Sequence, residues 1–391
     1  MMQNNPPQLT KKSDRHHRVF FDALIAFIFI AGINLPLIVP LLKINPTPIY
    51  DKLSKRQFDL QEWGLNTDEF NFYYKNNFGF RQSLIRFLGQ LMFNVFQVSP
   101  SHKVQLGNNG WLFLKSQDAI EGYRRLYPFE DEQLDEWQKM LEARHQFCAE
   151  LGIPYIFVIA PNKETIYGKE LPAYLSPIDN PSRLDQLIAR LQETNSPVQI
   201  VDLRGALFDA SQNHRTYHRT DTHWNFFGAY VGYTQIAKKL NQIGIPVDAS
   251  PLHKIRIKRE TAQGGDLARM MGLKQDITEE RLLLDLSDLC VATHEDGSPL
   301  IMEDLDISND SVGVTLCPQA KIDKAVVFHD SFGKALSPYL ASQVKRTRFM
   351  RMRSNQFDPN LVKVEQPDFV IQELVERRLF NREPNFKEFD D

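Results

Sequence analysis

The chain has 391 residues, of which 42% are hydrophobic and 24% are charged, so it can bury a large core and is not an intrinsically disordered protein. Its formal net charge of −3 gives no overall electrostatic case for nucleic-acid binding, which usually depends on a basic face. Three cysteines, Cys148, Cys290 and Cys317, are too few for a disulfide framework and allow at most one pair.

The first predicted element is a membrane anchor. Residues 19–42 form an apolar run in which Asp22 is the only charged residue, and about 20 apolar residues suffice to cross a bilayer as a helix. Four basic residues precede the run: Lys11, Lys12, Arg15 and Arg18. Because basic residues mark the cytoplasmic flank of a membrane helix, we predict a cytoplasmic tail over residues 1–18 and a single-pass anchor in the inner membrane over 19–42. The rest of the chain is then expected on the periplasmic side.

A cleavable signal peptide is the competing interpretation of this segment, since it too combines a basic start with an apolar run. The end of the run, residues 36–43, contains no convincing cleavage site with small residues. A buried helix of a soluble protein is disfavoured by the length and apolarity of the run. We therefore favour a retained anchor.

A helical neck is predicted over residues 43–100. Apolar residues recur at helical spacing between residues 68 and 98, with a glycine-containing break at 77–81. The domain that follows, residues 101–380, begins with a tight turn at 107–110 and an apolar strand behind it. A polar tail is expected over 381–391.

Within this domain, apolar runs alternate with helical patterns. The runs predicted as strands are residues 155–160, 197–203, 325–328, 346–352 and 369–374. The patterns predicted as helices are residues 130–152, 182–193, 226–243, 333–342 and 360–364. Near-continuous apolar strands suit a parallel sheet covered on both faces. We therefore predict an α/β fold with a largely parallel sheet, interrupted by an irregular insertion of short strands and loops over about 250–318.

The first candidate site lies where a predicted strand ends and a helix begins, at His329-Asp330-Ser331-Phe332-Gly333. A serine at such a junction stands above the sheet edge, and the following helix offers backbone N–H groups to a developing oxyanion. Alternatively, Asp330 or Ser331 simply caps the helix, which is the commoner role for either residue type.

The second candidate site is Asp221-Thr222-His223, just before the predicted helix 226–243. Residues two apart in extended backbone point to the same side, so the Asp221 carboxylate can hold the His223 imidazole as in a Ser-His-Asp arrangement. An imidazole has a pKa near 6.5, which suits a general base. The alternative is a capping aspartate beside a surface histidine.

The same stretch contains four potential metal ligands, because His214, His218, Asp221 and His223 lie close together in sequence. Their spacing matches no known metal motif, and the stretch has no helical face to align them. The chain also lacks a phosphate loop, a dinucleotide fingerprint and a paired-cysteine motif. We therefore predict neither a bound metal nor a cofactor.

Taken together, these motifs resemble the alginate O-acetyltransferase AlgX/AlgJ family. The most specific matching stretches are 220–225, which contains Asp-x-His-Trp, and 329–333, which contains Asp-Ser-Phe. Further matches in the same order are 77–81, 110–113, 265–270, 367–370 and 376–377. The resemblance implies a three-layer α/β/α SGNH-hydrolase-like fold and a triad of Asp221, His223 and Ser331. Asn162, in a loop after a predicted strand, is the candidate oxyanion-hole side chain.

The resemblance also implies a function. Ser331 would form an acyl-serine intermediate and pass the acetyl group to hydroxyls of an exported polysaccharide. A multi-pass membrane acyltransferase would supply the acetyl group, and no nucleic acid is involved. Two alternatives remain open at this stage. An esterase would use the same triad and end on water, and a noncatalytic scaffold of a polysaccharide-assembly complex would not use it at all.

Overall fold

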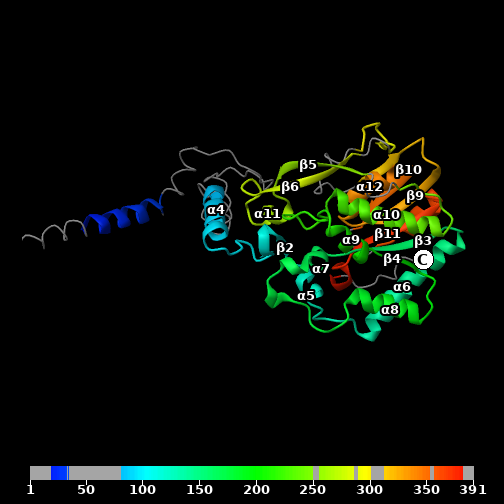
Figure 1. The fold of residues 1–391 in the computed structure, drawn as a ribbon, viewed down its shortest axis with the longest axis horizontal. Coiled ribbons are helices and arrows are strands. Elements are labelled where there is room, and N and C mark those ends of the chain that lie inside the picture. Colours follow the sequence, from blue (N-terminus) through cyan, green and yellow to red (C-terminus); the bar gives the residue numbers. More distant parts are fainter. Residues whose placement is uncertain are drawn as a thin grey trace, which may run out of the picture. The chain divides into compact units, whose positions relative to one another are not determined.

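The computed structural model describes residues 19–32, 34, 81–249, 255–285, 289–300, 312–352 and 356–381 (Figure 1). The predicted cytoplasmic tail, most of the predicted neck and the tail after Asn381 lie outside these residues. The chain divides into two units, Met1–Phe96 and Gln97–Asp391.

In the first unit, residues 19–32 are helical, whereas residues 35–42 of the predicted anchor lie outside the described residues. In the described ranges, no helix combines the length and the apolar character that a bilayer crossing requires. The anchor over 19–42 therefore stays a prediction. The end of the predicted neck contains helix α4 (Arg81–Gln90), which continues as a π-helical turn, η1 (Leu91–Val95).

The second unit is built on a seven-stranded sheet with the strand order β4-β3-β11-β9-β10-β8-β7. Five of its strands run parallel to one another: β3 (Tyr155–Ala160), β4 (Gln199–Asp202), β9 (Ile322–His329), β10 (Val344–Arg351) and β11 (Phe369–Val375). Two short strands continue the sheet antiparallel beyond β10, namely β8 (Gly313–Leu316) and β7 (Thr293–His294). The sheet is therefore mixed. Its antiparallel edge comes from the segment that was predicted to be an irregular insertion.

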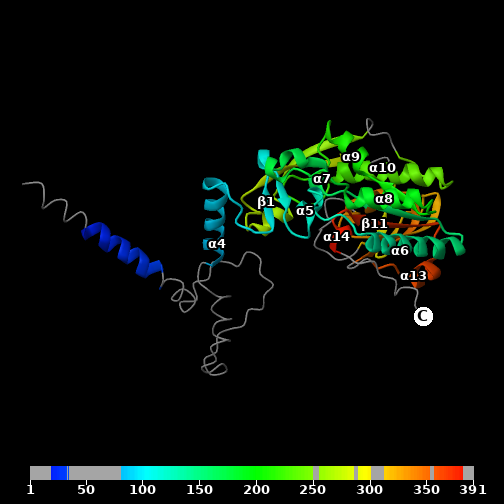
Figure 2. The same cartoon turned by 90° about the horizontal axis from the view of Figure 1, so that it is seen from below.

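Helices cover both faces of this sheet (Figure 2). One layer consists of α9 (Arg204–Ser211), α10 (Phe226–Gln242) and α12 (Gly333–Ala341), and the other consists of α6 (Asp131–Glu150), α8 (Arg183–Glu193) and α13 (Pro359–Glu365). Strand β3 divides its side chains between the two cores. Ile156 and Val158 join the α10 and α12 side, while Phe157 and Ile159 join the α6 and α8 side. Burial on both faces explains the near-continuous apolar runs of the sequence.

Smaller elements surround this three-layer core. They are β1 (Val104–Leu106), η2 (Asn108–Gly110), β2 (Leu112–Leu114), α5 (Ala119–Tyr123), α7 (Lys163–Tyr167), η3 (Gly168–Glu170), η4 (Ala173–Leu175) and α14 (Arg378–Asn381). An antiparallel ribbon of β5 (Arg256–Gln263) and β6 (Thr278–Asp285) flanks the short helix α11 (Asp266–Met270). Strand β5 is mostly exposed, which is why its sequence carries no apolar alternation.

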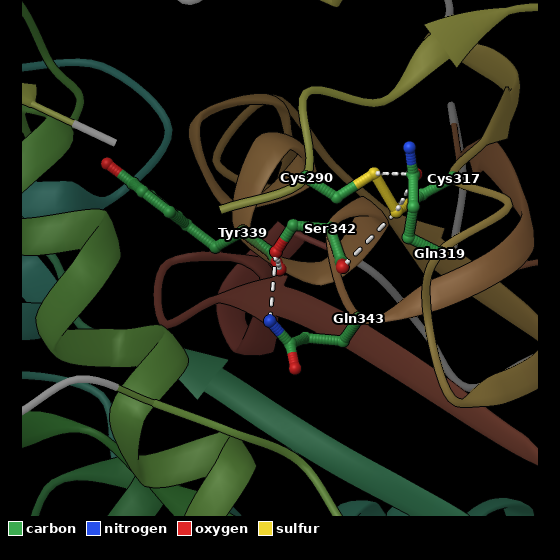
Figure 3. Close-up of a disulfide and its surroundings, with 6 residues drawn as sticks. All are labelled: Cys290, Cys317, Gln319, Tyr339, Ser342 and Gln343. Atoms are coloured by element: carbon green, nitrogen blue, oxygen red, sulfur yellow. Dashed lines mark hydrogen bonds between the residues drawn. A yellow bond between two sulfur atoms is a disulfide. The ribbon is translucent and has the colours of Figure 1, made fainter. Parts of the chain in front are cut away.

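Cys290 and Cys317 form a disulfide that closes a sequence separation of 27 residues. The sulfur of Cys317 packs 3.5 Å from the backbone oxygen of Ser342, just beyond helix α12 (Figure 3). The disulfide therefore links the segment before β7 to the end of β8, beside the hydrophobic core of the second unit. The third cysteine, Cys148 on α6, is free and buried, and burial raises the pKa of its thiol to about 12.

Candidate active site

The three residues of the predicted triad meet at the carboxyl ends of the parallel strands. Asp221 and His223 lie in the loop that leads into α10, and Ser331 lies between β9 and α12. The Nε2 atom of His223 is 2.8 Å from the Ser331 hydroxyl, and its Nδ1 atom is 2.6 Å from Asp221 Oδ1. With Nδ1 donating to the carboxylate, Nε2 is free to accept the serine proton. A general base needs this reach.

The serine sits on a tightly held turn. The Asp330 carboxylate accepts hydrogen bonds from Phe332 N–H and Val375 N–H, both at 2.9 Å, and so ties the turn to strand β11. Asp330 N–H in turn donates to Glu373 on β11 at 3.2 Å. Asp330 is therefore a structural anchor and not merely a helix cap, while Ser331 remains partly exposed.

Gly333 is required by the same turn. A Cβ atom at this position would lie 2.6 Å from the His329 Cγ atom, closer than any normal contact. His329 is fully buried, and burial lowers the pKa of its imidazole to about 4. It donates from Nδ1 to the Asp330 carbonyl at 2.6 Å. His329 thus supports the turn as a neutral side chain.

The carboxylate of Asp221 is prepared as an anion. Its burial alone would favour the neutral acid, but the His223 imidazole and the N–H of Asp266 hold the pKa of Asp221 well below its usual range. Oδ1 also accepts the His223 backbone N–H at 3.0 Å, and Oδ2 accepts the Asp266 N–H at 2.8 Å. These bonds fix the carboxylate against the imidazole. The charged form can therefore stabilise an imidazolium.

A second carboxylate, Asp266 at the start of α11, was not assigned a role from sequence. It accepts hydrogen bonds from the Thr222 N–H at 2.8 Å and the Thr222 hydroxyl at 2.5 Å, and lies 3.8 Å from His223 Nδ1. Burial and the neighbouring Asp221 raise the pKa of Asp266. The matching stretch 265–270 was the available signal, but the contact with residues 221–223 depends on the fold.

Two aromatic side chains pack behind the histidine. Trp224 is buried, and its indole N–H donates to the Phe332 carbonyl at 3.0 Å. The Phe332 ring lies 4.9 Å from the His223 ring and 5.4 Å from the Trp224 ring, measured between centroids. Trp224 therefore joins the loop of the histidine to the turn of the serine, and it is not exposed as a platform for sugar.

Asn162, the candidate oxyanion-hole residue, follows β3 and is buried. Its backbone N–H donates to Glu376 at 2.9 Å, and its Oδ1 accepts the Arg377 N–H at 3.3 Å. Among the residues that the structure describes, none forms a hydrogen bond with its Nδ2 donor. The Arg377 guanidinium lies 5.3 Å from the centroid of the Phe332 ring, which follows Ser331. A buried unpaired donor is costly and points to a missing acceptor.

In the described part of the chain, His214, His218, Asp221 and His223 do not assemble into a metal site. His214 packs its ring against Phe227, and the side chain of His218 faces Glu279. Among the described residues, the three potential ligand groups that come together are Asp221, His223 and Asp266, with ligand atoms within 4.8 Å of one another. His223 Nδ1 and Asp221 Oδ1 already bond to each other. A metal at this position would have to displace the proton between them.

Comparisons with known proteins find the family that the sequence motifs resemble. Residues 104–291 match the model of the SGNH hydrolase-like domain of acetyltransferase AlgX. A probable alginate O-acetylase AlgJ from Azotobacter vinelandii is 25% identical over 174 residues, which are 44% of this chain and 42% of that protein. The chain thus matches less than half the length of this curated relative. The family resemblance drawn from the motifs is confirmed for the matched segment.

Two solved structures are also similar. Bacillus cereus PatB1 is 17% identical, with a TM-score of 0.49 and coverage of 73% of this chain and 99% of that one. The O-acetyltransferase domain of Pseudomonas putida AlgJ is 19% identical, with a TM-score of 0.45 and coverage of 73% and 95%.

Proposed function

We propose that the protein is a polysaccharide O-acetyltransferase with Ser331 as its nucleophile, starting from the match of residues 104–291 to the model of the SGNH hydrolase-like domain of acetyltransferase AlgX. The observation that carries the proposal is the 2.8 Å contact between the Ser331 hydroxyl and His223 Nε2, with Asp221 on the opposite side of the imidazole. This is the geometry of an activated serine.

In the first half-reaction, Ser331 Oγ attacks the carbonyl carbon of an acetyl ester or thioester while His223 Nε2 takes the hydroxyl proton. The negative charge on the tetrahedral intermediate is stabilised by the Ser331 backbone N–H, with Asn162 Nδ2 as the candidate second donor. The intermediate collapses to acetyl-Ser331. The leaving alcohol or thiol departs with the proton from His223.

In the second half-reaction, a sugar hydroxyl gives its proton to His223 and attacks the acetyl-serine. A second tetrahedral intermediate collapses, the sugar keeps the acetyl group, and His223 returns the proton to Ser331 Oγ. The Asp221 carboxylate stays ionised throughout and stabilises the imidazolium in both halves.

The proposal also covers the cellular compartment in which the reaction takes place. We propose that the apolar run over residues 19–42 anchors the chain in the inner membrane with the catalytic unit on the periplasmic side. The Cys290–Cys317 disulfide supports this placement, because disulfides persist in oxidising compartments. The acceptor is then an exported polysaccharide, and a multi-pass membrane acyltransferase delivers the acetyl group.

The test uses the full-length protein, 4-nitrophenyl acetate as the acetyl donor, and oligosaccharides as acceptors. We expect an acetyl adduct on Ser331 by peptide mass spectrometry and acetylated oligosaccharide as product. Ser331→Ala should abolish both. Ser337→Ala, which removes a buried hydroxyl bonded to the Lys334 carbonyl on the same helix, should retain both.

Other products would change the conclusion. Free acetate alone, at a rate unaffected by acceptor, would make the protein an esterase with the same triad. An unchanged rate in Ser331→Ala would remove the serine from the mechanism. Absence of any adduct and product from the wild-type protein would favour the scaffold.

A further inference from the structure

Lys163 is a buried charged residue of the site that the acyl-transfer steps leave without a role. It follows the candidate oxyanion residue Asn162, opens helix α7, and is only 1% exposed. Its ammonium lies 5.2 Å from the centroid of Phe113 and 5.7 Å from that of Trp111. Burying a lysine is expensive unless the ammonium is fully hydrogen-bonded.

The ammonium group bonds to the loop that carries the catalytic base. Lys163 Nζ donates to the carbonyls of Asp221 at 2.7 Å, Arg219 at 3.2 Å and His218 at 3.3 Å. Three N–H donors therefore meet three carbonyl acceptors within four residues of sequence. His223 lies two residues after Asp221. These bonds therefore fix the backbone from which the side chains of Asp221 and His223 project.

We infer that Lys163 is a positioning residue, whose protonated amine holds the Asp221–His223 loop in register with the loop of Asn162 and thereby with Ser331. The inference rests on the proposed function and deepens it. In this role, Lys163 keeps the base His223 and the candidate oxyanion donor Asn162 at a fixed distance from each other.

Four acidic side chains from different parts of the fold interact electrostatically with the Lys163 ammonium. Burial lowers the pKa of Lys163 to about 8, while four carboxylates oppose that shift: Glu164 on α7, Asp266 on α11, Glu279 on β6 and Asp221 in the loop. The ammonium form therefore prevails at neutral pH. Above about pH 8 the amine keeps only two N–H donors for three carbonyls.

Lys163→Met keeps the volume and apolar stem but removes all three donors. A displacement of the base by about 1 Å costs on the order of 10²-fold in rate. We therefore expect kcat to fall roughly 10²-fold with KM for the acetyl ester changed much less. Lys169→Met, an exposed lysine on the adjacent turn η3, should leave kcat unchanged and serves as the matched control.

The pH profile separates this role from a merely structural one. In the wild type, kcat should fall above pH 8 as Lys163 loses its proton. Glu164→Gln removes the largest of the opposing charges and should move that fall to lower pH. Lys163→Arg keeps its charge at alkaline pH and should move the fall upward, and this variant also provides a test if Lys163→Met does not fold.

A measurement that needs no turnover distinguishes failure of the inference from failure of the proposed function. In full-length protein with ¹⁵N-labelled histidine, the Nδ1–H of His223 bonded to Asp221 should give a strongly downfield proton resonance in NMR spectra. We expect this resonance to be lost or broadened in Lys163→Met and above pH 8 in the wild type, and retained in Lys169→Met. A folded Lys163→Met protein with the wild-type resonance and the wild-type alkaline profile would overturn the inference, whatever the reaction proves to be.

Discussion

His223 Nε2 and the Ser331 hydroxyl approach to 2.8 Å although 108 residues separate them in the chain. The contact exists because the loop before α10 and the turn after β9 end at the same edge of the sheet. The residues after His223 and Ser331 are Trp224 and Phe332, and these two also form a hydrogen bond with each other. Serine and histidine are thus held by packing behind them as well as by their own hydrogen bond.

Replacing Asp221 by asparagine should leave the fold nearly intact and lower kcat about 10⁴-fold. An amide cannot accept the Nδ1 proton as a carboxylate does, and its NH₂ group favours the wrong imidazole tautomer. Steady-state kinetics with the chromogenic acetyl ester provide the rate. Asp266→Asn is the companion variant, because its amide oxygen can still accept the Thr222 N–H, and its loss should be smaller. Equal losses in both variants would contradict the assignment of Asp221 as the main partner of His223.

Gly265→Ala should damage the site by displacing Asp221. Gly265 has φ −79°, which alanine tolerates, but an added Cβ would lie 2.6 Å from Asp221 Oδ2. The carboxylate must then move, and we expect a loss of about 10²-fold in kcat. Gly205→Ala is the control. Nothing lies within 4 Å of its Cβ position on exposed α9, so it should keep full activity and gain about 0.5–1 kcal/mol of stability. A fully active Gly265→Ala enzyme would show that Asp221 tolerates displacement.

The free energy of unfolding should decrease as the pH falls, because His329 is buried as a neutral side chain. Burial lowers the pKa of His329 to about 4, below the value of 6.5 for an exposed imidazole. At pH above 6.5 both states are neutral. Between pH 6.5 and 4 only the unfolded chain takes up the proton, so unfolding becomes easier by up to about 3 kcal/mol.

Urea denaturation at pH values from 7 to 4 provides the measurement for this prediction. His329→Gln cannot titrate, so its free energy of unfolding should lose that part of the pH dependence. His102→Gln, which alters an exposed histidine, should retain the wild-type slope. An unchanged slope in His329→Gln would place the acid sensitivity in other groups.

Reduction of the Cys290–Cys317 disulfide should destabilise the second unit by about 3.5 kcal/mol, as expected for a closed loop of this size. Thermal unfolding with and without a reductant measures the effect. The double variant Cys290→Ser/Cys317→Ser should unfold at the temperature of the reduced protein and show no response to reductant. Cys148→Ala should still respond. A wild-type protein indifferent to reductant would mean that the bond does not form or does not constrain the unfolded chain.

Much of the sheet could be predicted from sequence because its strands are buried on both faces. The run at 155–160 coincides with β3, and the run at 369–374 falls one residue short of β11. Short strands were predicted within 250–318, but the bounds of β5 and β6 and their pairing could not be, since exposed strands such as β5 carry no apolar pattern. The bounds of β7 and β8, and their place in the main sheet, could not be predicted either. They are short, and their pairing with β10 depends on long-range contacts.

The candidate triad could be predicted for a related reason. Asp221 with His223, and Ser331 between strand and helix, are each local patterns that carry their own chemistry. Lys163 and Asp266 form no such local pattern, because a lone lysine or aspartate has no sequence signature. Their role comes from carbonyls and N–H groups that the fold brings to them. Asn162 was found only through its place after a strand.

The outer strands of the main sheet are short, four residues in β4 and two in β7. A strand of that length exposes few unpaired backbone groups, so it is a poor template on which a second molecule could continue the sheet. The short outer strands therefore protect the second unit against edge-to-edge aggregation.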